Sequence, residues 1–123
     1  MYEYKAEVTK VVDGDTIDAM IDLGFDIWIK RRIRLYGVNT SETRTKDKEE
    51  EKKGLIAKER VIEVLKKGNN KILLTSKGLD KYGRCLGEVC LSDVKIESEK
   101  YLGNSINKML LAEGHAKEYY GQN

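Results

Sequence analysis

The sequence is poor in proline, and also in histidine and cysteine, which bind metals in many proteins. It contains no proline, one histidine and two cysteines among 123 residues. Cys85 and Cys90 do not have a metal-ligand spacing and have no histidine near them. We therefore expect free, partly buried thiols, with a disulfide as the alternative. His115 cannot form a histidine-based metal site alone, and we expect it at the surface or at the end of a helix.

Long apolar runs and a strong bias of charge are also missing. No run approaches the roughly 18 residues that cross a bilayer, and the first residues lack the apolar segment of a signal peptide. We expect no membrane partner and a cytoplasmic location, or a secreted protein if a leader was removed. The formal net charge is +2. This value argues against a protein that coats nucleic acid through a broad basic surface, but it allows a local basic patch.

What the sequence does contain is typical of a folded, charge-rich globular protein. Hydrophobic residues make up 40% of the chain and charged residues 36%. A chain of this length can bury a core without disulfides or structural metals. We therefore expect residues 1–123 to form a single domain, and the protein to be a monomer.

The spacing of apolar residues predicts three strands, a helix, two strands and a last helix. Alternation indicates strands at residues 4–12, 16–23 and 27–36, and helical periodicity follows at residues 54–67, with Leu55 on the apolar face. Two more strands are predicted at 71–76 and 84–91, and a helix capped by Asn104 or Ser105 ends at Gly114. Residues 43–53 are predicted as a polar loop and 92–103 as irregular. Five short strands with a helix after the third predict a mainly β protein with α (α+β), a five-stranded OB-fold barrel with two to three helices.

Four polar stretches interrupt this pattern. They are Asp13-Gly14-Asp15-Thr16, the single Arg34, Asn39-Thr40-Ser41-Glu42 and the run from Asp80 to Arg84. Taken singly, each could be a turn, a solvated strand edge or a loop. Taken together, they supply carboxylate and amide oxygens of the kind that Ca²⁺ prefers. They also supply two guanidinium groups that can each bind phosphate oxygens in a bidentate fork. This combination fits metal-assisted hydrolysis of phosphodiesters.

The same stretches resemble the staphylococcal nuclease family. The segments are "VVDGDTI", "RIRLYGVNTSE" and "DKYGRCLGEV", in this order, and the tail "LLAEGHAKEYY" is similar to the last helix of the family and the segment after it. The resemblance runs from about Tyr4 to Tyr120. It implies an OB-fold barrel and a Ca²⁺-dependent nuclease that acts on DNA and RNA, preferably single-stranded, with little sequence preference. The products would carry 3′-phosphate ends.

The resemblance also assigns roles to residues. It implies that Asp15, Asn39 and Thr40 bind Ca²⁺, the last through its backbone carbonyl. It implies that Arg34 and Arg84 clamp phosphate and that Glu42 acts as general base. Asp13 would lie near the metal. The residues that would contact the bound nucleotide are Lys81, Tyr82 and Tyr120.

Three departures from the family pattern affect these expectations. Asn39 stands where the family has an aspartate ligand, and Ser41 stands where it has a proline. The interval between Thr16 and Arg34 is longer, so the second hairpin should protrude. Two alternatives therefore stay open. One is a catalytically weak or inactive domain that binds single-stranded nucleic acid, as other OB-folds do. The other is a protein-interaction module that uses the tyrosines and the tryptophan of the barrel surface.

Overall fold

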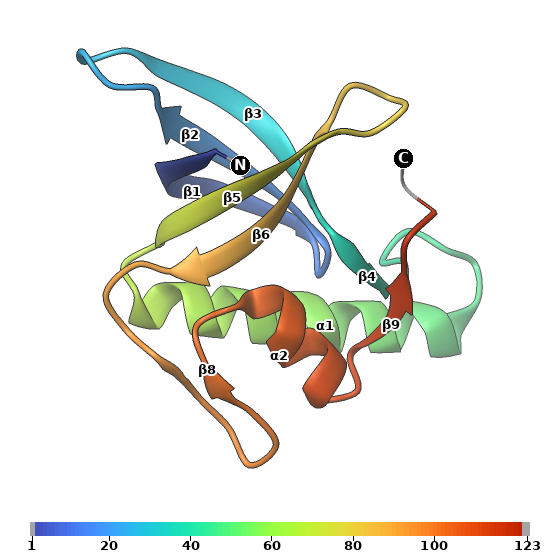
Figure 1. Ribbon diagram of the computed structural model, residues 1–123. Coiled ribbons are helices and arrows are strands. Elements are labelled where there is room, and N and C mark those ends of the chain that lie inside the picture. The colour runs from blue at the N-terminus through green and yellow to red at the C-terminus, as the bar shows by residue number, and fades with distance from the viewer. Residues whose placement is uncertain (1, 122–123) are drawn as a thin grey trace.

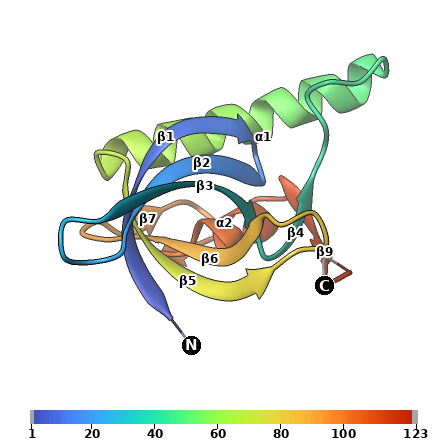
Figure 2. The ribbon, with the colours of Figure 1, turned by 90° about the horizontal axis from the view of Figure 1, so that it is seen from above.

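The computed structural model describes residues 2–121, and a closed five-stranded barrel forms its centre (Figures 1 and 2). The strands in spatial order are β1 (Glu3–Asp13), β2 (Thr16–Asp22), β3 (Trp28–Leu35), β6 (Cys85–Leu91) and β5 (Lys71–Leu79), which returns to β1. Neighbouring strands are antiparallel except for the parallel pair β3 and β6. The predicted α+β fold with an OB-fold barrel is confirmed.

Two helices pack on the barrel in the described chain, α1 (Lys48–Lys67) and α2 (Ile106–Ala112). The helix α1 runs beneath the barrel in the view of Figure 1 and lies along one side of it in Figure 2. It buries Ala57, Val61 and Leu65 against the barrel. Leu55 is 43% exposed, so its predicted place on the buried face is wrong. Within residues 2–121, no helix combines the length and apolar character needed to cross a membrane.

The helix α1 begins earlier than the sequence pattern predicts. Residues 48–53 are helical, although we expected them in a polar loop. The Asp47 side chain caps the helix by accepting hydrogen bonds from the backbone N–H groups of Glu49 and Glu50. The acidic side chains in the first turn also interact favourably with the positive end of the helix dipole. A charged run without apolar periodicity therefore forms a helix because of its cap and its dipole.

Four short strands were not predicted. The strands β4 (Gly37–Thr40) and β9 (Ala116–Tyr119) pair in antiparallel fashion, with Asn39 opposite Lys117. The strands β7 (Ile96–Glu97) and β8 (Leu102–Gly103) form a small hairpin in the segment expected to be irregular. Each is too short to show a convincing alternation of apolar residues. The β4–β9 ribbon extends the end of the barrel at which Arg34 lies.

The helix α2 holds the ribbon against the barrel. Its N-cap is Ser105, one of the two predicted capping residues, and it ends before Gly114, whose φ of +77° favours glycine. Inside the helix, the buried side chain of Asn107 donates to the carbonyl of Tyr36 at 2.8 Å and accepts from the N–H of Val89 at 3.0 Å. This amide joins α2 to β6 and to the residue between β3 and β4.

The hairpin between β2 and β3 protrudes from the barrel, as expected from its length (Figure 1). Phe25 at its tip is 97% exposed, and Trp28 at the start of β3 is 48% exposed. Both Phe25 and Asp26 have positive φ values. This tip lies at the opposite end of β2 and β3 from Thr16 and Arg34, which are paired at the other end of the hairpin.

The two cysteines are free thiols, as predicted, and both are partly buried on β6. Burial raises the pKa of Cys85 and of Cys90 above the ordinary value. A thiol with a raised pKa carries little thiolate at neutral pH and reacts slowly. The cysteines therefore belong to the packing of the barrel.

Candidate active site

The bend between β1 and β2 carries the first candidate ligand. Asp13 pairs with Thr16, so the chain reverses through Gly14 and Asp15. A Cβ atom at Gly14 would lie 2.9 Å from the Cβ of Ala57 on α1 and 3.1 Å from the Cγ2 of Thr40 on β4. The glycine is needed because α1 and β4 pack directly against the bend. The bend turns Asp15 inward, where the residue is only 7% exposed.

The carboxylate of Asp15 ties the bend to β4. Its Oδ2 accepts a hydrogen bond from the backbone N–H of Thr40 at 3.0 Å, and its Oδ1 accepts from the Thr16 hydroxyl at 2.9 Å. The Oδ2 also lies 3.3 Å from Nη2 of Arg34. Two predicted metal ligands, Asp15 and Thr40, are therefore neighbours in space, with Arg34 beside them.

Arg34 is built into the end of the barrel. Its Nη1 donates to the backbone carbonyls of Val38 at 2.8 Å, Leu35 at 3.1 Å and Asp15 at 3.4 Å. Its Nη2 donates to Oδ1 of Asn39 at 3.1 Å. Burial lowers the pKa of Arg34 below its ordinary value, while the negative charge of Asp15 opposes this shift. Arginine remains protonated in proteins, so the site holds a fixed, largely desolvated positive charge.

Arg84 is held by a turn instead of by the barrel. The turn between β5 and β6 folds around Asp80, whose Oδ1 accepts from the backbone N–H groups of Tyr82 at 2.9 Å and Arg84 at 2.8 Å. The Oδ2 of Asp80 accepts from Nε of Arg84 at 2.6 Å. Burial alone would raise the pKa of Asp80, but the bonds from the backbone N–H and the side chain of Arg84 lower it. The guanidinium is thereby oriented through Nε, and within residues 2–121 its Nη atoms have no hydrogen-bond partner.

The two arginines line one cavity of about 310 Å³, which we call the arginine pocket. Its lining includes five residues predicted from the sequence, namely Arg34, Asn39, Lys81, Tyr82 and Arg84. The Tyr82 ring is 73% exposed and lies 5.3 Å from Nζ of Lys81 and 5.6 Å from Cζ of Arg84. In Figure 1, the turn between β5 and β6 and strand β9 lie at the same end of the barrel.

Four predicted site residues lie outside the lining of this pocket, namely Asp15, Thr40, Glu42 and Tyr120. Glu42 is exposed on the loop after β4, and its side chain lines no part of the pocket. The backbone of this loop is held in place at Glu42 and at the residue after it. The Thr43 hydroxyl donates to Asp13, and a Cβ atom at Gly54 would lie 2.6 Å from the carbonyl oxygen of Glu42. Tyr120 is 58% exposed, and its ring centre lies 5.6 Å from that of Tyr36.

Tyr119 is a lining residue of the arginine pocket that the sequence analysis missed. It is placed there by the pairing of β9 with β4, in which Tyr119 lies opposite Gly37. The adjacent Tyr120 packs instead over Gly37, where a Cβ atom would come within 2.8 Å of its ring. The resemblance pointed to Tyr120, whereas the pocket lining contains its neighbour Tyr119. The nucleotide contact of Tyr120 stays a prediction. The signal that could have separated them is the alternation of side chains along β9.

The oxygen donors near Asp15 suit a hard cation such as Ca²⁺, which accepts carboxylate, amide and backbone oxygens. Asp15, Asn39 and Thr40 supply one oxygen donor of each kind. The Thr40 hydroxyl is buried and has no hydrogen-bond partner in the part of the chain that the structure describes. That same part contains no group of three or more His, Cys, Asp or Glu residues that could hold a metal. The donor set therefore fits Ca²⁺ in kind but contains a single carboxylate.

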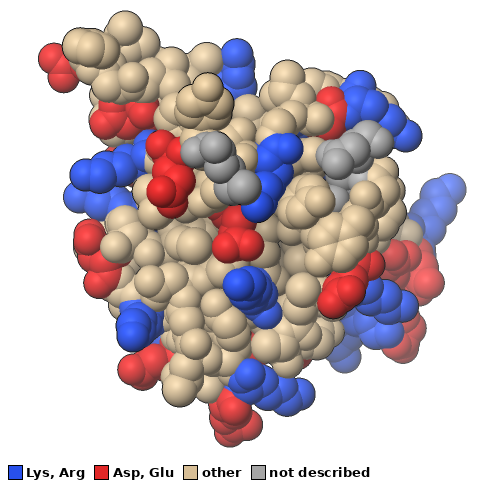
Figure 3. Space-filling model, viewed as in Figure 1, with Lys and Arg blue, Asp and Glu red and all other residues tan. Residues whose placement is uncertain are grey.

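The charges on the surface around the site are mixed. On the face seen in Figure 3, basic and acidic side chains are interspersed, and neither sign covers that face. The arginine pocket is a local concentration of positive charge. Local charge of this kind positions phosphate without attracting nucleic acid over the whole surface.

The fold and the site together define a class of protein, a small OB-fold barrel with two arginines in one pocket at its end. The family model for staphylococcal nuclease homologues matches residues 32–123, and the chain belongs to this family. The match includes Arg34, Glu42 and Arg84 and begins after Asp15. Membership indicates a domain of a nuclease and nucleic-acid-binding family.

One relative extends over most of the chain. The chain is 27% identical to Protein ParB of Escherichia coli over 117 residues, which cover 95% of this chain and 58% of that protein. The chain therefore spans well under two thirds of the length of this relative. The similar region covers nearly the whole chain and includes the Asp13–Thr16 bend. It assigns no role to any residue.

Proposed function

We propose that this protein is a nuclease that hydrolyses phosphodiester bonds of DNA and RNA, preferably in single strands and with little sequence preference. The observation that carries the proposal is the arginine pocket. Arg34 is fixed by three backbone carbonyls, and Arg84 is aimed by Asp80 with its Nη atoms unbonded in the described residues. Preorganised guanidiniums suit the negative charge that grows on phosphate oxygens during hydrolysis. Membership of the staphylococcal nuclease family supports the proposal.

The proposed reaction is the attack of water on phosphorus. The new bond joins the water oxygen to phosphorus, the bond to the 5′ oxygen breaks, and the leaving oxygen takes up a proton. The products then carry 3′-phosphate ends. Glu42 is proposed to accept the proton from the attacking water. Its side chain is exposed and has no hydrogen-bond partner in residues 2–121, so it is free for this role.

Asp15, Asn39 and Thr40 are the residues that would hold Ca²⁺. When bound, the ion would supply positive charge that polarises a phosphate oxygen. Asp15 also orders the site through the chain itself, because its carboxylate fixes the N–H of Thr40. Lys81 and Tyr82 are proposed to contact a terminal phosphate of the substrate. The aromatic rings of Tyr119 and Tyr120 are available for stacking on a base.

The decisive experiment compares degradation of denatured DNA in Ca²⁺ and in EDTA. We expect cation-dependent degradation by the unaltered protein, and its loss in Arg84→Ala. Arg31→Ala is the matched control, because Arg31 is an exposed arginine on β3 that lines no part of the arginine pocket. Equal activity of Arg84→Ala and the unaltered protein would contradict the proposed role of the pocket.

A second candidate function is a domain that binds single-stranded nucleic acid without cutting it. The observation that favours it is the single carboxylate of the donor set, together with the engagement of Asn39 Oδ1 by Arg34. An electrophoretic shift of denatured DNA without degradation, at any Ca²⁺ concentration, would support this function. Products with 3′-phosphate ends would exclude it.

A further inference from the structure

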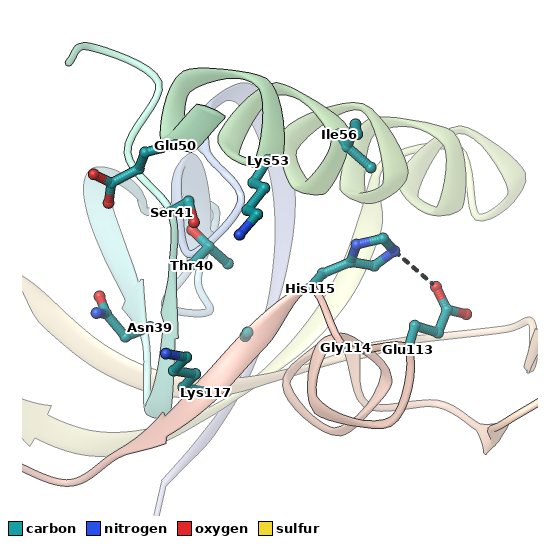
Figure 4. A pocket seen from close by; sticks show the side chains of 11 residues that line it. Asn39, Thr40, Ser41, Glu50, Lys53, Ile56, Glu113, Gly114, His115 and Lys117 are labelled. Carbon is teal, nitrogen blue, oxygen red and sulfur yellow. Dashed lines mark ion pairs between the residues drawn. The ribbon is translucent and has the colours of Figure 1, made fainter. Parts of the chain in front are cut away.

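A second and larger cavity lies beside the arginine pocket. Its volume is about 530 Å³, and it is bounded by β4, by α1 and by the turn into β9. We call it the α1–β9 cleft. Figure 4 shows Lys53 extending from α1 into the space towards β4, and Lys117 on β9 beside Asn39. None of the roles considered above uses either lysine.

The charges in the cleft leave the lysines available. Glu113 lies at the edge of the cleft, but Arg60 binds its carboxylate with two bonds of 2.7 and 2.8 Å. His115 lies 3.5 Å from the same carboxylate. This histidine follows the end of α2, as predicted. In residues 2–121, Lys53 and Lys117 have no ion-pair partner, and Glu50 is the other acidic residue in the lining.

The cleft and the arginine pocket meet at one residue. Asn39 lines both cavities. Its partner across the β4–β9 ribbon is Lys117, which lines the cleft, and Tyr119 two residues further along β9 lines the pocket. Residues two apart on a strand point to the same side and are about 7 Å apart. An extended strand of nucleic acid bound in the pocket can therefore continue over this side of β9 into the cleft.

We propose that the α1–β9 cleft binds the backbone of the nucleotides that flank the scissile bond, with Lys53 and Lys117 on successive phosphates. The inference rests on the proposed function, because it assumes that the arginine pocket holds the scissile phosphate. The half-exposed side chain of Ile56 gives the cleft an apolar wall for a sugar or a base. Contacts of this kind do not read sequence, and their number grows with the length of the strand.

The test measures binding of two probes by fluorescence anisotropy in EDTA. One probe is a thymidine dinucleotide, and the other is an oligothymidylate of about 12 nucleotides, which is within the site size of one OB-fold. Lys53→Ala and Lys117→Ala should each weaken binding of the longer probe about three- to tenfold. Each variant should also reduce the slope of log affinity against log salt by about 0.7. Binding of the dinucleotide should stay as in the unaltered protein.

Lys52→Ala is the matched control. Lys52 is exposed on α1 next to Lys53 and lines neither cavity. Replacing it with alanine removes the same positive charge as the other two substitutions. Its binding of both probes should be unchanged. Glu50→Gln should tighten binding of the longer probe, because it removes the remaining negative charge from the lining. Equal weakening by Lys52→Ala, or equal weakening of both probes, would overturn the inference. Thermal unfolding of each variant checks that the fold is intact.

Two further outcomes separate this inference from the proposed function. If the unaltered protein cuts DNA but Lys53→Ala and Lys117→Ala bind the longer probe normally, the cleft inference is wrong and the nuclease proposal stands. If the unaltered protein cuts nothing but the two variants lose affinity for the longer probe only, the nuclease proposal is wrong, and the cleft binds the backbone of a strand that the domain holds without cutting.

Discussion

The two arginines of the pocket are held in opposite ways. Arg34 is buried at 7% exposure and bonded to backbone carbonyls at the junction of β3 and β4. The Arg84 side chain is 35% exposed and belongs to a turn whose anchor is Asp80. One side of the pocket is therefore part of the barrel, and the other is added to it. This difference predicts which substitutions change the fold and which change only the chemistry.

The largest effect is expected for Arg34→Ala. The change removes the positive charge beside the buried Asp15 carboxylate and the guanidinium donor to the carbonyls of Leu35 and Val38. Breaking a buried pair on one side costs about 3–5 kcal/mol. We expect the free energy of unfolding in urea to fall by about that amount, together with nearly all activity. A stability equal to that of the unaltered protein would remove the distinction between the two arginines.

Arg84→Ala should lose activity and keep stability. Its guanidinium contacts phosphate in the proposed reaction, and a loss of about a thousandfold in kcat corresponds to about 4 kcal/mol. The buried Asp80 carboxylate keeps its bonds from the backbone N–H groups of Tyr82 and residue 84 after the change, so the urea midpoint should move much less than for Arg34→Ala. The measurement is kcat on denatured DNA beside urea unfolding, with Arg31→Ala as the control. A variant that unfolds as easily as Arg34→Ala would place Arg84 in the structural class.

Glu42→Gln examines the loop on the Arg34 side of the pocket. The change keeps the shape of the side chain and removes its ability to accept a proton. We expect turnover to fall about a hundredfold or more, as for the loss of a general base, with nucleotide affinity near that of the unaltered protein. Steady-state kinetics and nucleotide titration give the two quantities. An unchanged rate would limit Glu42 to the structure of the loop.

Asn39→Asp should improve Ca²⁺ binding. Restoring a negative charge about 4 Å from a divalent ion gains roughly 4 kcal/mol at an effective dielectric near 20, and desolvation offsets part of that gain. We expect a net gain of about 1–3 kcal/mol, or roughly ten- to a hundredfold in affinity. The measurements are Ca²⁺ titration by calorimetry and the Ca²⁺ concentration for half-maximal activity. A variant that needs as much Ca²⁺ as the unaltered protein would show that Asn39 does not face the ion.

The smallest effect concerns pH and Asp80. The pKa of this carboxyl is lowered in the folded state, so Asp80 stabilises the fold above its unfolded pKa of about 3.9. That contribution is lost as the pH falls through the lower, folded pKa. Asp80→Asn should reduce stability at neutral pH by about 1 kcal/mol and should flatten the decline of stability below about pH 4. Parallel pH profiles of the two proteins would contradict this role.

The sequence predicted the barrel because alternation in the long strands is directly visible. The resemblance to the staphylococcal nuclease family pointed to Arg34 and Arg84, and the structure places both in one pocket. The start of α1 could not be predicted from periodicity, since its first turn depends on the Asp47 cap. The short ribbon of β4 and β9 was missed, because its strands are stable only through pairing with each other and packing on α2. Tyr119 was missed with it.

The burial of Arg34 could not be predicted either. Taken singly, Arg34 could have been the solvated edge of a strand. The structure shows that the chain turns sharply after β3, so that the carbonyls of Leu35 and Val38 close around the guanidinium. Tertiary contacts of this kind leave no periodic signal in a sequence.

The single tryptophan gives the protein a built-in spectroscopic signal that lies away from the pocket. Trp28 lies at the hairpin end of β3, six residues from Arg34 and so about 20 Å along the strand. Its emission should follow unfolding of the barrel and should stay silent when a nucleotide enters the pocket. The pocket itself contains Tyr82 and Tyr119 and no tryptophan in its lining. Tryptophan emission can therefore report the integrity of the barrel separately from occupancy of the pocket, in one cuvette and without a label.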